Sequence, residues 1–138
     1  MCMFRLFLVM ILCGFMSAAD IEVGKEYAVT QMNGVKIVAG TVAPTILLDG
    51  KTRNVLGTSG VNRYSGSFVI KDGSITFGTL ACTMMAGPDE TMAQEQTFIE
   101  IVAVPLKIEA NDQGLLLSGT KGSLQMAVKP AALDKARE

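Results

Sequence analysis

The residues best suited to binding chemistry in this 138-residue chain are concentrated in the run Asn62-Arg63-Tyr64-Ser65-Gly66. Asn62 and Arg63 supply hydrogen-bond donors and Tyr64 an aromatic face, a set that could bind a peptide end, a glycan or a lipid head group. The same residues could instead form a structural corner, because Asn bonds to nearby backbone groups in turns and Gly lets strands bend. We favour the corner, and we keep Arg63 and Tyr64 as the two side chains to test for binding.

The residue types exclude most covalent and metal chemistry. The chain has no His, which rules out Ser-His-Asp triads, Cys-His dyads and the usual His-containing zinc sites. Cys82 is the one cysteine beyond residue 19, and an unpaired Cys is predicted to be a small buried apolar side chain. We therefore expect no enzyme, no cofactor and no metal.

A carboxylate-dependent hydrolase is the least favoured alternative. Such an enzyme needs two acids that face one cleft. The candidate acids are Asp89, Glu90, Glu95 and Glu100. All four fall in one predicted helix, whose exposed face accounts for most of them.

The segment Leu80–Pro88, "LACTMMAGP", is the second candidate region. Met84 and Met85 could line an adaptable hydrophobic groove, because thioether side chains are flexible and polarisable. Alternatively, one of the two plugs an end of the sheet, and this is the interpretation that we favour.

The first nineteen residues predict a secretory signal peptide. Arg5 precedes an apolar run over 6–16, and the small residues Ser17 to Ala19 follow, so cleavage is expected before Asp20. The run is shorter than the roughly 20 residues of a membrane span, although an uncleaved anchor stays open as an alternative. We expect a secreted or periplasmic protein with one domain over 20–129 and a polar tail over 130–138, to which we assign no role.

The charge of the remaining chain argues against nucleic acid as a partner. Residues 1–19 contain one of the twelve Lys and Arg residues and none of the thirteen Asp and Glu residues, so the rest carries a net charge of −2. Nucleic-acid binding usually needs a basic face. A length of about 120 residues corresponds to one ordinary domain.

Turn dipeptides divide that domain into short strands. Asn33-Gly34, Asp49-Gly50 and Asp72-Gly73 are hairpin signals. Apolar and polar residues alternate between them, and the connections are too short for parallel crossovers, so the sheet is predicted to be antiparallel. Strands are expected over 26–32, 36–40, 44–49, 65–70, 74–78, 104–110, 114–119 and 123–128, with Phe68, Ile70, Ile75 and Phe77 on the inner faces of one hairpin.

One segment has helical spacing instead. Pro88 and the acids after it suit a helix start, and Pro105 ends the pattern, so a helix is predicted over about 88–103. Its buried stripe is expected to contain Met92, Phe98, Ile101 and Val102, with Glu90, Gln94 and Glu100 outside. Such a stripe is typical of a core rather than a ligand site. The sequence thus predicts one α+β domain.

Four short motifs resemble those of a known family. They are Gly60 with Asn62 to Gly66, then Phe77-Gly78, then Thr83 with Met85-Ala86, and finally Glu95 with Phe98 on the helix. Together with the opening strand at 26–37 and the closing hairpin at 114–128, they resemble the META domain family of HslJ-like secreted or envelope proteins. Two departures stand out: Val61 and Gly87 occupy positions where the family often has Cys, so any role of that Cys pair is absent here.

The resemblance implies a small antiparallel sheet, curved or barrel-like, with one packed helix and no known catalytic activity. It implies a stress- or envelope-related binding module, because members are associated with the bacterial envelope, with stress and drug resistance, and in some parasites with virulence. Another envelope protein is the expected partner, and an apolar ligand or lipid in the sheet concavity is the alternative. Because Arg63 and Glu95 both match the family pattern, we also hypothesise that they form an ion pair.

Overall fold

The structure is a computed structural model that describes residues 21–129. The predicted signal peptide with its cleavage before Asp20, and the predicted tail over 130–138, lie outside the described residues. The elements, in chain order, are β1 (Glu26–Met32), β2 (Val35–Lys36), β3 (Thr45–Asp49), β4 (Asn54–Thr58), β5 (Arg63–Lys71), β6 (Ser74–Phe77), β7 (Ala81–Cys82), α1 (Asp89–Val102), β8 (Leu106–Asn111), β9 (Gly114–Gly119) and β10 (Gly122–Val128).

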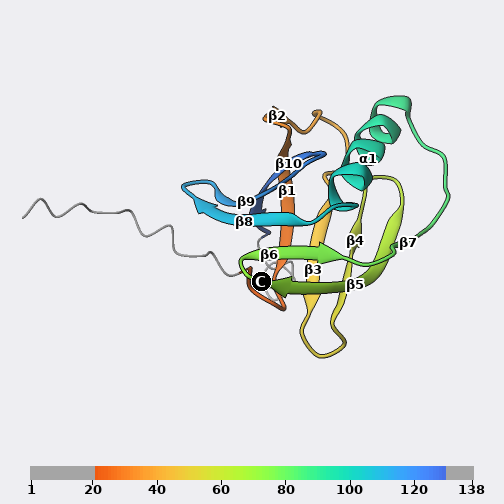
Figure 1. The fold of residues 1–138 in the computed structure, drawn as a ribbon. Coiled ribbons are helices and arrows are strands. Elements are labelled where there is room, and N and C mark those ends of the chain that lie inside the picture. Colours follow the sequence, from red (N-terminus) through yellow and green to blue (C-terminus); the bar gives the residue numbers. More distant parts are fainter. Residues whose placement is uncertain (1–20, 130–138) are drawn as a thin grey trace, which may run out of the picture.

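The strands form an antiparallel sheet that closes on itself (Figure 1). Its order is β10-β9-β8-β6-β5-β4-β3-β1, and β10 pairs back onto β1, with Tyr27 opposite Val128. The short strands β2 and β7 lie off this ring and pair with β1 and β5. The predicted α+β class with a barrel-like sheet and one helix is confirmed.

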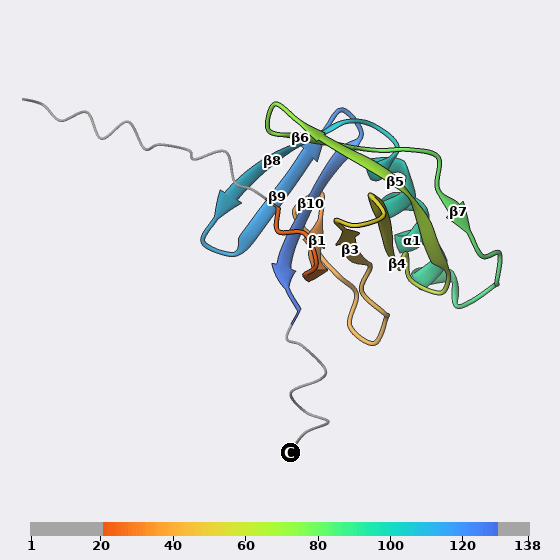
Figure 2. The ribbon, with the colours of Figure 1, turned by 90° about the horizontal axis from the view of Figure 1, so that it is seen from below.

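The interior of the barrel is filled by apolar side chains. Alternating residues on each strand point inward, as a two-residue period requires. The side chains of Ile46, Leu48, Ile75, Leu106, Leu117 and Leu124 have no exposed area. Helix α1 lies across one end of the barrel (Figures 1 and 2), where it contacts β10 and adds Phe98 and Ile101 to this core.

Two of the three predicted turns have the expected geometry. Asn33-Gly34 and Asp72-Gly73 both have positive φ at the two turn residues, 53° and 77° in the first and 52° and 74° in the second. This geometry matches the twist of a two-residue hairpin. The third turn is longer than predicted: Asp49 caps the loop 50–53 through its side chain, which accepts a hydrogen bond of 2.9 Å from the Lys51 N–H, and Arg53 has positive φ.

One strand prediction was wrong, and two strands were missed. The run predicted over 36–40 is strand only at Lys36, and the missed strands are β4 and β7. β4 has one fully buried apolar residue, Val55, so its alternation is weak. β7 consists of two exposed residues and exists only because β5 offers it a ladder of hydrogen bonds.

Ile70 lies on the predicted face of its hairpin, but this end of the face is not covered. It lies directly opposite Ile75 in the β5–β6 pair, yet Ile70 is 40% exposed and Ile75 is fully buried. The cause is the neighbouring strands. Ile75 is also covered by Leu106 of β8, whereas the pairing of β5 with β4 has already ended at Ser67.

Helix α1 is found within one residue of the predicted ends, but its buried face differs from the prediction. Phe98, Ile101 and Val102 are buried as expected, and Met92 is only partly buried. Gln94, predicted to be outside, is buried. Its side-chain oxygen accepts a hydrogen bond of 3.2 Å from the Val38 N–H, so a loop covers this side of the helix. Glu90 and Glu100 are exposed as predicted.

Within residues 21–129, no helix combines the length and the apolar character that a membrane crossing requires.

Candidate functional site on β4, β5 and β7

Of the run Asn62–Gly66, Asn62 lies in the corner between β4 and β5, whereas Arg63 to Gly66 are the first residues of β5 and pair with β4. The Ser59 N–H donates a hydrogen bond of 2.9 Å to the Asn62 carbonyl, and Gly60 supplies a φ of 142°. The Asn62 side chain is buried. Its Oδ1 accepts hydrogen bonds from Thr83 Oγ1 at 2.9 Å and from the Met85 N–H at 2.6 Å, and its Nδ2 donates to the Met85 carbonyl at 3.1 Å.

The second partner of this corner is the buried carboxylate of Glu95 on α1. Glu95 accepts hydrogen bonds from Ser59 Oγ at 2.7 Å, and from the backbone N–H and Nδ2 of Asn62, both at 2.9 Å. Burial by itself raises the pKa of Glu95, but the hydrogen bonds from Ser59 and Asn62 outweigh it, so the pKa lies below the ordinary value.

We call these residues the Asn62–Glu95 network: Ser59, Asn62, Thr83, Glu95 and the Met85 backbone. The network joins the β4–β5 corner to α1 and to the segment after β7. Across residues 21–129, no buried side-chain N or O atom lacks a hydrogen-bond partner. The corner interpretation therefore accounts for Asn62, Thr83, Met85 and Glu95, which the structure brings together. Ser59 was missed, because a Ser before Gly predicts a turn and carries no signal of a distant partner.

The hypothesised Arg63–Glu95 ion pair is wrong. Arg63 is the first residue of β5, directly after Asn62, and is exposed. Because neighbouring residues of an extended chain point to opposite sides, its side chain lies on the other face of the sheet from the network. The carboxylate that Arg63 was expected to bind is instead satisfied by neutral donors.

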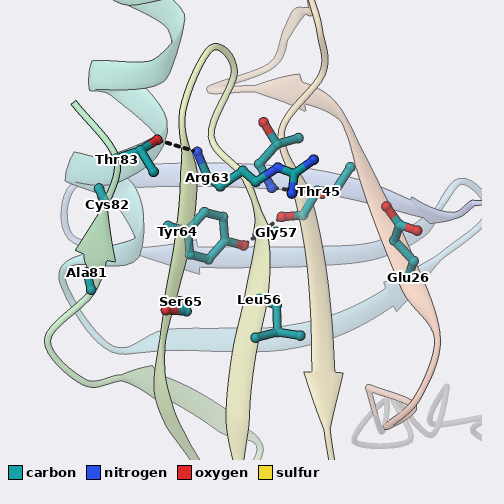
Figure 3. Close-up of a pocket in the computed structure, with 11 residues that line it drawn as sticks. Glu26, Thr45, Leu56, Gly57, Arg63, Tyr64, Ser65, Ala81, Cys82 and Thr83 are labelled. Atoms are coloured by element: carbon teal, nitrogen blue, oxygen red, sulfur yellow. Dashed lines mark hydrogen bonds between the residues drawn. The ribbon is translucent and has the colours of Figure 1, made fainter. Parts of the chain in front are cut away.

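Arg63 and Tyr64 border a cleft of about 680 Å³ on the outside of the barrel (Figure 3). We call it the Arg63 cleft. It is lined by strands β1, β3, β4, β5 and β7 and the residue after β7, with the side chains and backbone of Glu26, Thr45, Leu56, Gly57, Thr58, Arg63, Tyr64, Ser65, Ala81, Cys82 and Thr83.

Tyr64 belongs to the wall of this cleft rather than to its reactive groups. Its ring is buried and lies 5.5 Å from the ring of Phe98. Its hydroxyl is buried as well and donates a hydrogen bond of 2.6 Å to the Thr45 carbonyl. Burial raises the pKa of Tyr64 well above the ordinary value, so the phenol stays protonated.

Arg63 is the charged group of the cleft that no carboxylate neutralises. The backbone N–H of Arg63 donates a hydrogen bond of 3.0 Å to Thr83 Oγ1. The Arg63 side chain extends across the cleft towards Thr45 in Figure 3. The ion pairs within residues 21–129 are Lys25–Glu22, Lys107–Glu109 at 2.9 Å and Lys129–Glu26 at 3.3 Å. None of them uses Arg63, and Glu26, the acid that lines the same cleft, is paired with Lys129.

The predictions for Cys82 and for the two adjacent methionines were wrong. Cys82 is exposed, because β7 pairs with β5 on one side only. Met84 is 93% exposed and Met85 is 55% exposed, so neither plugs an end of the barrel. The structure matches the less favoured alternative better, which was a groove lined by Met84 and Met85. Both residues border a second cleft of about 420 Å³ beside α1.

The acids of α1 do not form a catalytic pair in the described residues. Glu95 is the one carboxylate that lines the second cleft, while Asp89, Glu90 and Glu100 are exposed. Within residues 21–129, no three side chains of the His, Cys, Asp and Glu types are grouped so that they could hold a metal ion.

The chain folds as a small barrel-and-helix domain. It combines a closed antiparallel barrel, one helix across the end of the barrel, and the Asn62–Glu95 network that joins the helix to the sheet. The family profile described as the META domain matches residues 19–131, and the chain therefore belongs to the META domain family.

Two solved structures have the same fold. One, described as an NMR structure of a protein, superposes with a TM-score of 0.62 at 22% identity and covers 76% of this chain and 89% of the other. The second, an NMR structure of a protein from Burkholderia xenovorans, has a TM-score of 0.61 at 22% identity and covers 78% of this chain and 83% of the other. At this level of identity the similarity concerns the fold alone. No curated protein matched the chain.

Proposed function

We propose that this META-domain protein is a non-catalytic interaction module of the cell envelope or the secreted space, and that it binds another protein through the Arg63 cleft. The observation that carries the proposal is the position of Arg63. Its guanidinium lies over an open cleft of about 680 Å³, and no acid within residues 21–129 pairs with it.

The chemistry of arginine indicates what the partner presents. A guanidinium is planar and always charged, and it binds carboxylates through two parallel hydrogen bonds. Arginine is also enriched among the residues that dominate binding energy at protein interfaces. We infer that the partner places an acidic side chain or a chain terminus in the cleft.

The surroundings of Arg63 favour binding over catalysis. The Tyr64 hydroxyl is committed to the Thr45 carbonyl, and its raised pKa keeps it protonated, so no phenolate is available as a base. The network acid Glu95 already accepts hydrogen bonds from Ser59 and Asn62.

The location in the envelope or secreted space rests on the signal-peptide pattern of residues 1–19, and a stress-related role rests on the family.

Co-purification from envelope and culture-medium fractions tests this function. The chain and its Arg63→Glu variant are compared as baits, and Arg53→Glu serves as the matched control. Arg53 is also an exposed arginine, but it lies at the other end of β4. We expect one acidic-segment partner to bind the parent chain and the control, and to be lost with Arg63→Glu. Equal recovery with all three baits contradicts the proposal.

A lipid or other apolar ligand is the second candidate, although not inside the sheet. The interior of the barrel is occupied by core side chains, so the place left for such a ligand is the second cleft, beside the exposed Met84 and Met85. An apolar ligand there should tolerate Met84→Leu, because leucine keeps the apolar surface.

A further inference from the structure

Four sulfur-containing side chains border the second cleft. Cys82, Met84 and Met85 come from β7 and the segment after it, and Met92 comes from α1. We call this set the sulfur groove. In the sequence these residues are divided between a loop and a predicted core stripe, and only the fold brings Met92 to the other three.

The backbone directs the side chains of Met92 and Cys82 to the same side. On α1, Met92, Gln96 and Ile99 have the spacing of one helix face, and all three line the groove. Cys82 lies directly opposite Tyr64 in the β5–β7 pair, and directly opposed residues point to the same face of a sheet. Because the Tyr64 ring packs against Phe98 of α1, Cys82 is on the helix side of β7.

The segment that carries the two adjacent methionines is held in place. Asn62 makes hydrogen bonds to both the N–H and the carbonyl of Met85, at 2.6 and 3.1 Å. A fixed backbone thus presents two thioethers to solvent, with Met84 93% and Met85 55% exposed. Large apolar side chains exposed together on a small protein indicate a binding surface.

The ligand class follows from the donor atoms. Thiolate and thioether sulfur are soft ligands that select Cu(I) over Mg²⁺, Ca²⁺ and other hard cations. The groove contains one carboxylate, that of Glu95, and it is occupied by hydrogen bonds within the protein. We propose that the sulfur groove binds one Cu(I) ion through the Cys82 thiolate and the thioethers of Met84, Met85 and Met92.

Binding requires no change in oxidation state. The Cys82 thiol gives up its proton to solvent as the Cu–S bond forms, and the thioethers donate lone pairs without losing a proton. This proposal departs from the sequence-based expectation of no metal, and it is independent of the Arg63 cleft: Arg63 does not border the groove, although Cys82 and Thr83 border both clefts.

Methyl NMR of the methionines, recorded on the full chain, tests the proposal directly. The probes are Ag(I), a stable soft monovalent ion, and Cu(I) under reducing, oxygen-free conditions. We expect one equivalent of either ion to shift the ε-methyl signals of Met84, Met85 and Met92. The signals of Met32 and Met126, which are buried in the core, should stay in place and act as internal controls.

Substitutions separate sulfur ligation from apolar binding. Met84→Leu and Met92→Leu keep the apolar volume and remove the thioether, so each should lower the Cu(I) affinity about tenfold or more in competition with a Cu(I) chelator, while the circular dichroism spectrum is unchanged. Cys82→Ser should have the largest effect. Met32→Leu is the matched control and should bind as the parent does. All comparisons are made between identical preparations, because residues 1–19 contain sulfur of their own.

Three results would overturn the proposal. The first is an unchanged Cu(I) affinity in Met84→Leu and Met92→Leu. The second is a shift of the Met32 or Met126 signals as large as those of the groove. The third is a metal-bridged dimer in size-exclusion chromatography, because two copies joined through Cys82 do not need the thioethers.

Discussion

At the scale of single residues, Asn62 uses its hydrogen-bonding groups within the protein rather than for a ligand. Its side chain and backbone connect the β4–β5 corner, the Met85 backbone and the Glu95 carboxylate. A buried carboxylate is tolerated when several donors replace its water, and it becomes costly as soon as one donor is lost. The polar groups of Asn62 and Tyr64 are therefore directed into the protein, whereas Arg63 and Ser65 are exposed.

The Asn62–Glu95 network predicts a pH-dependent stability. A carboxyl whose pKa is lower in the folded than in the unfolded state stabilises the fold above its unfolded pKa of about 4.3, and this stabilisation is lost as the pH falls through the folded pKa. Glu95 has a lowered pKa. We expect Glu95→Gln to reduce the free energy of unfolding by about 2 kcal/mol at pH 7, and the difference from the parent to shrink between pH 5 and pH 3.

Urea unfolding at several pH values measures this difference. The control is Glu100→Gln, an exposed acid on the same helix, whose effect should be small at every pH. A gap between parent and Glu95→Gln that stays constant from pH 6 to pH 3 would show that the carboxylate is not the group that holds the network.

At the scale of elements, the two positions without the family's cysteines are neighbours in space. A Cβ built on Gly87 would lie 3.3 Å from the Cβ of Val61 and would overlap its Cγ2. The Val61 side chain thus fills the room that a side chain at Gly87 would need. Two Cβ atoms at nearly this separation are typical of a disulfide, so the segment after β7 and the β4–β5 corner are held here by packing and by Asn62 instead.

This proximity predicts that a disulfide can be introduced. The double variant Val61→Cys, Gly87→Cys should form the bond on air oxidation and raise the free energy of unfolding by about 2–4 kcal/mol. Mass spectrometry after thiol alkylation detects the bond, and denaturant unfolding with and without reductant measures its effect. Val61→Cys alone is the control. Two free thiols at these positions after oxidation would mean that the two elements lie farther apart than in the structure.

At the scale of the whole molecule, α1 covers one end of the closed barrel and contributes to its core. Phe98 and Ile101 have no exposed area and belong to the same apolar cluster as the strands. The helix starts without a side-chain cap, and fourteen residues form only a marginal helix in isolation. Its stability must therefore come from packing on the sheet.

The helix and the barrel should consequently unfold as one unit. Phe98→Ala removes the ring that packs on Tyr64 and should cost about 3–5 kcal/mol. Far-UV circular dichroism and tyrosine fluorescence should report the same transition in the variant and the parent. Glu100→Ala, exposed on the same helix, should change the stability by less than about 0.5 kcal/mol. Transitions that separate between the two probes would indicate that α1 is an independent unit.

The sequence by itself determined the features that depend on neighbouring residues. Period-two alternation, the positive-φ pairs Asn33-Gly34 and Asp72-Gly73, and the helix bounded by Pro88 and Pro105 are local signals, and the antiparallel barrel with one helix followed from them and from the META motifs. Tertiary structure alone decided what each polar or sulfur side chain faces, because burial depends on which strands pair. A hydrogen bond between residues 33 positions apart joins Asn62 to Glu95. The packing of strands and helix also places Arg63 over a cleft, Cys82 on the edge strand β7, and Met92 beside the same cleft as Met84 and Met85.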